Sequence, residues 1–175
     1  EKAKQAYEEW RVLEENVWFY PARDLLFYHA DIKGAFLTGK RMEVLRAIVE
    51  KKGREAITVV TTMDAFLDGL PSKEELCGNR IKIHAEEALD FQKLQENLSI
   101  LGYERENQVE SPGQFAVRGG ILDVFPLTEE NPVRIELWGG EVDSIRSFDV
   151  ESQRSTENLQ EIEIYPATEN WKQME

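Results

Sequence analysis

A phosphate-binding pattern is the first place in the sequence where residue types and spacing could do chemistry. Residues 34–40, Gly-Ala-Phe-Leu-Thr-Gly-Lys, match the opening of G-x-x-x-x-G-K, in which backbone N–H groups and the lysine hold phosphates. The next residue should be Ser or Thr to hold magnesium, and it is Arg41. The loop should also follow a buried strand, whereas polar residues such as His29 interrupt the preceding segment. A nucleotide site near Gly39 and Lys40 is therefore only an alternative to a helix N-terminus preceded by a glycine-bearing loop.

The remaining titratable residues predict no catalytic or metal centre. Cys77, His29 and His84 have a spacing that matches no zinc site, and neither histidine accompanies a nucleophile motif. Asp123 and Glu136 each stand between apolar residues of an alternating segment, which places them on the polar face of a sheet. We expect both carboxylates to be solvated there.

Two arginines stand out because basic residues are rare in the segment that contains them. Between residues 106 and 145 the sequence has eight acidic residues and only two basic ones, Arg118 and Arg134. Within residues 133–138, Val-Arg-Ile-Glu-Leu-Trp, strand alternation places Arg134, Glu136 and Trp138 opposite the apolar set. Exposed arginine and tryptophan often carry the binding energy of interfaces. Two interpretations stay open: a binding face, or arginines that pair with acids across strands beside a tryptophan folded over the hairpin.

The elements that must position these residues differ between the two halves of the chain. In the first half, apolar spacing predicts a helix up to about Glu15 and another over residues 39–50. Residues 17–20 and 56–62 have the composition of buried strands. Strands that alternate with helices indicate a parallel sheet, and two strands leave that sheet incomplete.

The second half predicts a small antiparallel sheet with one packed helix. Residues 80–84 alternate as a strand, and apolar residues from Phe91 to Leu101 line one face of a helix that Gly102 ends. Gly139 and Gly140 lie between two alternating segments and predict a two-residue hairpin turn. The strands are expected over residues 114–118, 121–125, 133–138, 141–148 and 162–166.

The predicted fold class is therefore α/β and α+β in one chain. We expect a partial parallel α/β domain over residues 1–79, a small antiparallel sheet module over residues 80–167 and a tail over residues 168–175. Just before the joint, Ser72 and Glu75 have the spacing of a capping box. Because the sequence opens on Glu1 within a helical pattern, we expect it to be part of a longer chain.

Charge and hydropathy exclude several classes of protein. The 175 residues include 34 acidic and 21 basic ones, a formal charge of −13 that disfavours direct nucleic-acid binding. No apolar stretch approaches the ~20 residues that cross a bilayer, and the N-terminus has no secretory pattern. We expect a soluble, cytoplasmic protein that contacts neither membrane nor nucleic acid directly.

The most specific pattern covers residues 113–155 and resembles a known domain family. Its parts are Gln114-Phe115-x-x-Arg118-Gly119, the strand Ile-Leu-Asp-Val-Phe-Pro, the strand from Arg134 to Trp138 and the segment from Glu141 to Arg146. They are similar to the second domain shared by the excision-repair protein UvrB and the bacterial transcription-repair coupling factors. Residues 148–154 are more similar to the coupling factors, and the first half resembles their truncated UvrB-like α/β domain.

This resemblance implies a function by contact. In that family the domain docks onto UvrA, the damage-sensing ATPase of excision repair, and so recruits repair to stalled RNA polymerase. By motif, the interface positions fall on Arg118, Arg134 and Trp138, which replaces the more usual Phe, with Arg146 as a rim contributor. The parent would be an ATP-dependent DNA translocase of the helicase superfamily, with ATP, magnesium and double-stranded DNA as ligands. This segment is expected to bind no cofactor and to catalyse no reaction.

Two further hypotheses compete with this interpretation. One is a fragment of a UvrB-type ATPase that binds nucleotide near Gly39 and Lys40. The other is that another domain of the parent covers the sheet face until a rearrangement exposes it. If the face binds UvrA, we expect alanine at both Arg118 and Arg134 to abolish binding and to leave the thermal melt unchanged.

Overall fold

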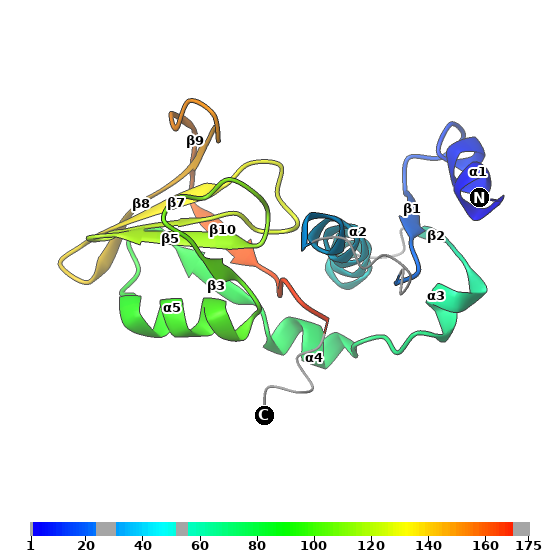
Figure 1. Ribbon diagram of the computed structural model, residues 1–175, viewed down its shortest axis with the longest axis horizontal. Helices are drawn as coiled ribbons and strands as arrows, with labels where there is room; N and C mark the ends of the chain where they lie inside the picture. Colours follow the sequence, from blue (N-terminus) through cyan, green and yellow to red (C-terminus); the bar gives the residue numbers. More distant parts are fainter. Residues whose placement is uncertain (1, 24–30, 52–55, 170–175) are drawn as a thin grey trace. The chain divides into compact units, whose positions relative to one another are not determined.

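The computed structural model describes residues 2–23, 31–51 and 56–169, with the side chains of residues 31–35 left out. The chain divides into two compact units, Glu1–Cys77 and Gly78–Glu175 (Figure 1). The expected joint lies between Asn79 and Arg80, and the tail expected from residue 168 is described only as far as Glu169. Parallel and antiparallel strands with few helices confirm the α/β and α+β fold class.

The first unit contains a parallel pair of strands with helices around it, as the sequence predicts. Its elements are α1 (Lys2–Trp10), β1 (Val17–Tyr20), α2 (Asp31–Glu50), β2 (Thr58–Thr61), α3 (Met63–Leu67) and α4 (Lys73–Gly78). Two predicted bounds were wrong. The first helix ends at Trp10 because residues 11–13 form a turn, and α2 begins at Asp31 instead of residue 39.

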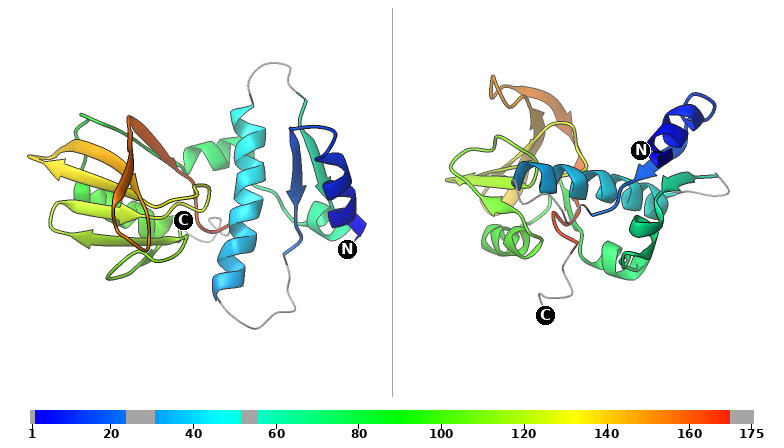
Figure 2. Two further views of the ribbon diagram at one scale, coloured as in Figure 1. Left: turned by 90° about the horizontal axis from the view of Figure 1, so that it is seen from above. Right: turned by 45° about the vertical axis from the view of Figure 1, so that its right-hand side comes forward.

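Alternation along β1 explains why α1 and α2 lie on opposite sides of the strand pair (Figure 2). On one side the ring of Phe19 lies 5.7 Å from that of Tyr7 in α1. On the other side the guanidinium carbon of Arg41 in α2 lies 4.2 Å from the ring centroid of Tyr20. Arg41 is buried, and its Nη1 donates to the carbonyl of Pro21 at 2.6 Å.

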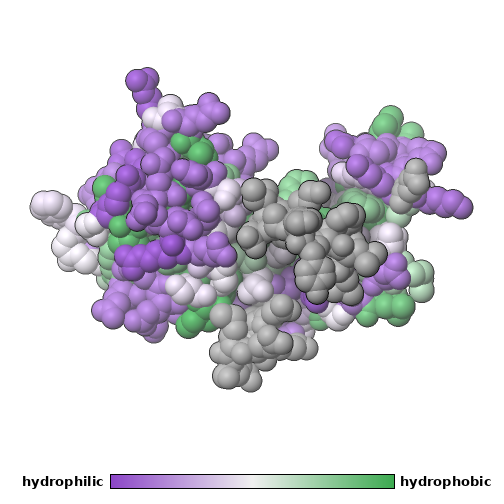
Figure 3. All heavy atoms as spheres, viewed as in Figure 1, coloured by the Kyte–Doolittle hydropathy of each residue, from purple (hydrophilic) through white to green (hydrophobic). Residues whose placement is uncertain are grey.

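The capping box before α4 has the predicted geometry. The N–H of Ser72 donates to Glu75 Oε2 at 2.7 Å, and the N–H of Glu75 donates to Ser72 Oγ at 3.1 Å. These reciprocal bonds use N–H groups that the first turn of a helix leaves unpaired. Just before this turn, α3 and the residues after it leave Met63, Phe66, Leu67 and Leu70 exposed, and hydrophobic residues show at the surface there (Figure 3).

The second unit has two sheets where the sequence predicted one. Its elements are β3 (Ile81–His84), α5 (Phe91–Ile100), β4 (Glu104–Arg105), β5 (Gln114–Arg118), β6 (Ile121–Val124), β7 (Val133–Trp138), β8 (Glu141–Phe148), β9 (Ser155–Leu159) and β10 (Glu161–Ile164). The larger sheet has the order β4-β5-β6-β7-β8-β9, whereas β3 and β10 pair with each other. Sequence reasoning missed β4, which has two residues and runs parallel to β5, and β9, which is almost wholly polar.

One apolar core lies between α5 and the larger sheet. Leu94 and Leu98 of α5 pack in one cluster with strand residues such as Leu122, Ile135 and Ile145. Asp90 begins the helix, since its Oδ1 accepts hydrogen bonds from the N–H groups of residues 92 and 93 at 3.1 and 3.0 Å. The core thereby fixes which face of β5–β8 points away from it.

The hairpin between β7 and β8 turns at Gly139 and Gly140, as predicted. Their φ angles are 64° and 93°, in the left-handed region where glycine has no Cβ penalty. Trp138 and Glu141 are Cα partners on either side of this two-residue turn. Trp138 is therefore held at the end of a strand and beside a tight turn.

Candidate protein-interaction face

The face of β5–β8 opposite the core brings together the arginines identified from the sequence. Ala116, Asp123, Arg134 and Arg146 are Cα partners in a row across the four strands. Alternation places Arg118 on the same face, two residues beyond Ala116. We call this the outer face and define it by Arg118, Asp123, Arg134, Glu136, Trp138 and Arg146. The alternate residues of β7 point to the core as expected: Val133 and Ile135 are buried in it, and Leu137 is partly buried against it.

Asp123 is the acceptor that both central arginines share. Its Oδ1 accepts from Arg134 Nε at 2.7 Å, and its Oδ2 accepts from Arg134 Nη2 at 2.8 Å and from Arg118 Nη2 at 2.7 Å. Only 2% of its side chain is exposed, so the prediction of a solvated carboxylate was wrong. Three charge-assisted hydrogen bonds replace the hydration that this carboxylate loses on burial.

A second apolar cluster lies beside Asp123 on the outer face. Val109, Ala116 and Phe125 form a second buried cluster, with Val150 packed against it. Ala116 is the Cα partner of Asp123 and leaves it room, while Val109 and Val150 come from the segments before β5 and after β8. Alternation identifies a face, but only tertiary structure shows which loops cover it.

Arg134 is held on several sides. Its side chain is 15% exposed, and its guanidinium carbon lies 4.6 Å from the ring centroid of buried Phe148. Gln153 Oε1 lies 3.5 Å from its Nη2, at the long limit of a hydrogen bond. The hydrogen bonds to Asp123 raise the pKa of the Arg134 guanidinium above its ordinary value, although burial opposes them. Arg134 is thus a permanent, pre-ordered cation.

Arg118 is the more accessible partner of Asp123. Its side chain is 51% exposed, and among the residues that the structure describes its hydrogen bond is the contact of Nη2 with Asp123. It reaches that carboxylate diagonally, because its own Cα partner on β6 is Ile121. One N–H therefore anchors the guanidinium and the others remain for a second acceptor.

Arg146 pairs with Glu136 rather than with Asp123. Its Nη2 contacts Glu136 Oε1, and Ser144 Oγ donates to the other oxygen of that carboxylate at 3.3 Å. Arg134 and Arg146 are direct Cα partners, an arrangement that repels unless each cation has its own acid. Glu136 is partly buried and ion-paired, so the expectation that it is fully solvated was only partly right.

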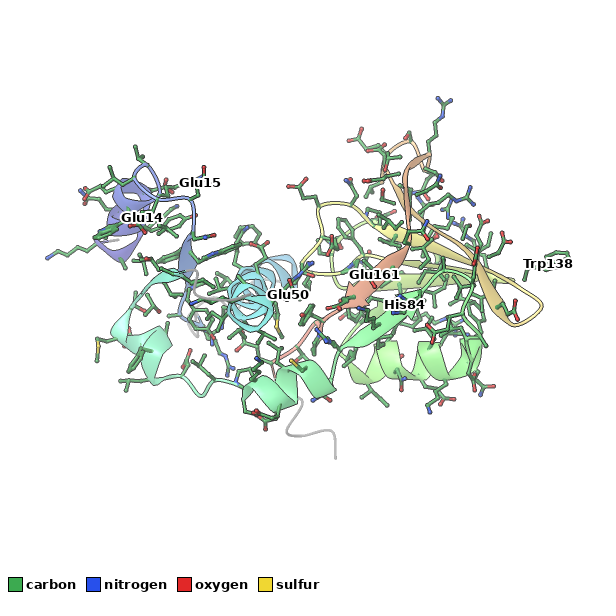
Figure 4. All side chains as sticks on the ribbon, turned by 180° about the vertical axis from the view of Figure 1, so that it is seen from behind. Glu14, Glu15, Glu50, His84, Trp138 and Glu161 are labelled. Atoms are coloured by element: carbon green, nitrogen blue, oxygen red, sulfur yellow. The ribbon has the colours of Figure 1, made fainter. Side chains whose placement is uncertain are left out.

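Trp138 is the exposed apolar member of this face. It is 83% exposed and projects beyond the end of the hairpin (Figure 4). The structure therefore agrees with one part of the second interpretation left open by the sequence and disagrees with the other part. Both arginines do pair with an acid across strands, but the tryptophan does not fold over the hairpin.

The phosphate-binding pattern does not have the form of a phosphate loop. Residues 34–40 lie within α2, so their backbone belongs to a helix rather than to a loop that could wrap phosphates. Lys40 pairs with Glu43 one turn along, with Nζ 2.9 Å from Oε2. His29 lies outside the described residues. Among the residues that the structure describes, no group of three or more His, Cys, Asp or Glu side chains could hold a metal, and no helix has the length and hydropathy to cross a membrane.

Comparison with known proteins identifies the family. The model of the UvrB interaction domain matches residues 81–170, which include the whole outer face. The chain belongs to this family. A transcription-repair-coupling factor of Bacillus subtilis is 38% identical over 156 residues, and one of Staphylococcus aureus is 34% identical over 155 residues. In both cases 89% of this chain is covered but only 13% of the relative. The UvrB interaction domain thus occurs here in a segment similar to a small part of those long proteins.

Proposed function

We propose that the second unit docks onto UvrA and that the chain serves this purpose within a transcription-repair coupling factor, recruiting UvrA to stalled RNA polymerase. The membership in the UvrB interaction domain family and the relatives in Bacillus and Staphylococcus support a role in such contacts. In this proposal the cytoplasmic parent protein supplies ATP and magnesium binding, DNA translocation and the contact with RNA polymerase. The segment itself supplies only a binding face.

The exposed Trp138 is the observation that carries the proposal. Trp138 is 83% exposed and therefore contributes little to folding, and it lies at the end of β7 beside a two-glycine turn. Large aromatic rings contribute strongly to binding when a partner buries them, because they lose little conformational entropy. Trp138 would fill an apolar site on UvrA.

The arginines supply the charge complementarity. Arg118 and Arg134 share one carboxylate, so this trio carries one net positive charge in a chain whose formal charge is −13. A local cation in an acidic surface favours a partner surface with carboxylates and disfavours other contacts. Arg118 is the arginine that would meet such a carboxylate directly, because half of its side chain is exposed.

The test is binding of UvrA by variants of the outer face. Arg118→Ala and Trp138→Ala are each expected to weaken binding about tenfold or more, measured by surface plasmon resonance with immobilised UvrA. Arg105→Ala is the matched control, because Arg105 is an exposed arginine on β4 and lies outside the outer face. Binding of UvrA by the two variants at wild-type strength would rule out the outer face as the docking site.

A separate measurement tests the absence of a cofactor. Titration of ATP and magnesium into the chain is expected to give no heat of binding, because residues 34–40 lie in a helix. Saturable binding would instead favour the hypothesis of a UvrB-type nucleotide site.

A further inference from the structure

We propose that Asp123 is a positioning residue for UvrA docking: it holds the guanidinium of Arg118 in the orientation that meets the partner. This inference rests on the proposed function and adds a residue that does not itself touch UvrA. Asp123 is 2% exposed, so a partner protein cannot reach its carboxylate without disturbing the sheet.

The hydrogen bonds divide the two arginines into different roles. Arg134 donates from Nε and Nη2 to the two oxygens of Asp123, a fork that uses the geometry of the guanidinium fully. Arg118 donates from Nη2 alone, to Oδ2 at 2.7 Å. Arg134 therefore fixes the carboxylate, and the carboxylate in turn fixes Arg118.

Pre-ordering is what Arg118 gains from this arrangement. A long side chain that is free in solution loses rotamer entropy when it docks, and that loss weakens binding. Asp123 restrains Arg118 before UvrA arrives, because the carboxylate is buried beneath the face and accepts two hydrogen bonds from Arg134. The negative charge of Asp123 also weakens the attraction between the two arginines and the acidic partner surface that they are expected to meet.

The Asp123→Asn variant distinguishes a role of Asp123 in positioning Arg118 from a role of its charge alone, because the two roles predict opposite changes in the affinity for UvrA. Asp123→Asn keeps the size of the side chain and removes its negative charge. If Asp123 mattered only by its charge, the face would become more positive and binding to an acidic surface would tighten. If Asp123 positions Arg118, binding weakens because the amide cannot hold two guanidinium groups. Tighter binding of UvrA would indicate an effect of charge alone, and weaker binding would indicate positioning of Arg118.

A double-mutant cycle separates positioning from general loss of structure. Asp123→Asn is expected to weaken UvrA binding about tenfold, mainly through faster dissociation, and to cause no further loss in the Arg118→Ala background. Equal losses in both backgrounds, or tighter binding, would overturn the inference. Glu163→Gln is the matched control, because Glu163 is a partly buried carboxylate that pairs with Arg80 at 3.0 Å in the other sheet.

A measurement without UvrA keeps the inference testable if Asp123→Asn folds poorly. Nitrogen relaxation of arginine Nε in the unaltered chain is expected to show Arg118 more ordered than Arg105, which is exposed on β4. Equal mobility of the two side chains would contradict positioning by Asp123. If the unaltered chain did not bind UvrA, the proposed function would fail, and this comparison would still decide whether Asp123 orders Arg118.

Discussion

At the scale of single residues, the contacts of Asp123 change what the two arginines contribute. Arg134 has 15% of its side chain exposed and two hydrogen bonds to a buried carboxylate, so it stabilises the fold as well as the face. Arg118 has 51% exposed and one such bond. The expectation that both could be replaced without effect on the thermal melt therefore needs revision for Arg134.

Arg134→Ala is expected to lower the free energy of unfolding by about 3 kcal/mol, since it leaves a buried carboxylate with one partner. Arg118→Ala is expected to cost less than about 1 kcal/mol, because the Arg118 side chain is half exposed and Asp123 keeps both of its hydrogen bonds to Arg134. Urea denaturation followed by circular dichroism measures both values. Equal stability of the two variants would show that the bidentate contact does not hold the sheet.

At the scale of elements, ion pairs join β3 to β10, two strands that are far apart in the sequence. Lys82 of β3 lies 3.1 Å from Glu161 and 3.3 Å from Glu163 of β10. Hydrogen bonds to these two carboxylates raise the pKa of Lys82. His84 Nδ1 lies 3.2 Å from Glu161 Oε2, and both side chains are labelled in Figure 4. The alternating basic strand thus meets an alternating acidic one.

The start of α5 offers a test of how far a helix cap supports the sheet. Asp90→Ala is expected to lower the free energy of unfolding by about 1 kcal/mol, because two N–H groups lose their acceptor. Asp143→Ala, at an exposed position of β8, is the matched control and should change stability by less than about 0.5 kcal/mol. A cap variant as stable as this control would mean that core packing alone holds α5.

At the scale of the whole molecule, the two units differ in how completely they bury their apolar residues. The second unit has a closed core, and its buried Tyr103 links the start of β4 to the end of β10: the hydroxyl donates to the carbonyl of Tyr165 at 2.8 Å. The first unit has a two-stranded sheet in the described part of the chain and exposes apolar residues of α3. We therefore expect the second unit to be the more stable of the two.

Tyr103 makes the stability of the second unit sensitive to alkaline pH. Burial raises the pKa of its phenol well above the ordinary value of 10.0. The unfolded chain therefore loses this proton first, so stability is constant below about pH 10 and falls as the pH rises above it. Tyr103→Phe should cost about 1 kcal/mol at neutral pH and make the alkaline decline shallower. Thermal melts from pH 8 to 11 would refute this if the two declines were parallel.

The sequence by itself determined most strands of the second unit and which of their residues point to the outer face. Alternation of side chains placed Val133 and Ile135 inward and Arg134 and Trp138 outward, because a strand has a period of two. The pair Gly139 and Gly140 determined the hairpin, because its turn needs positive φ angles that glycine adopts without strain. These signals are local, and local sequence therefore suffices for them.

Only the tertiary structure decided which residues of the outer face are buried and which of them pair. Asp123 is buried beside an apolar cluster that includes Val109 and Val150, which come from segments on either side of β5–β8 in the sequence. The pairing of β3 with β10 likewise joins residues far apart along the chain. Alternation gives a residue its face, but burial and partners depend on which distant segments pack on that face. For this reason the two arginines were visible in the sequence, while the carboxylate that holds them was mistaken for a solvated one.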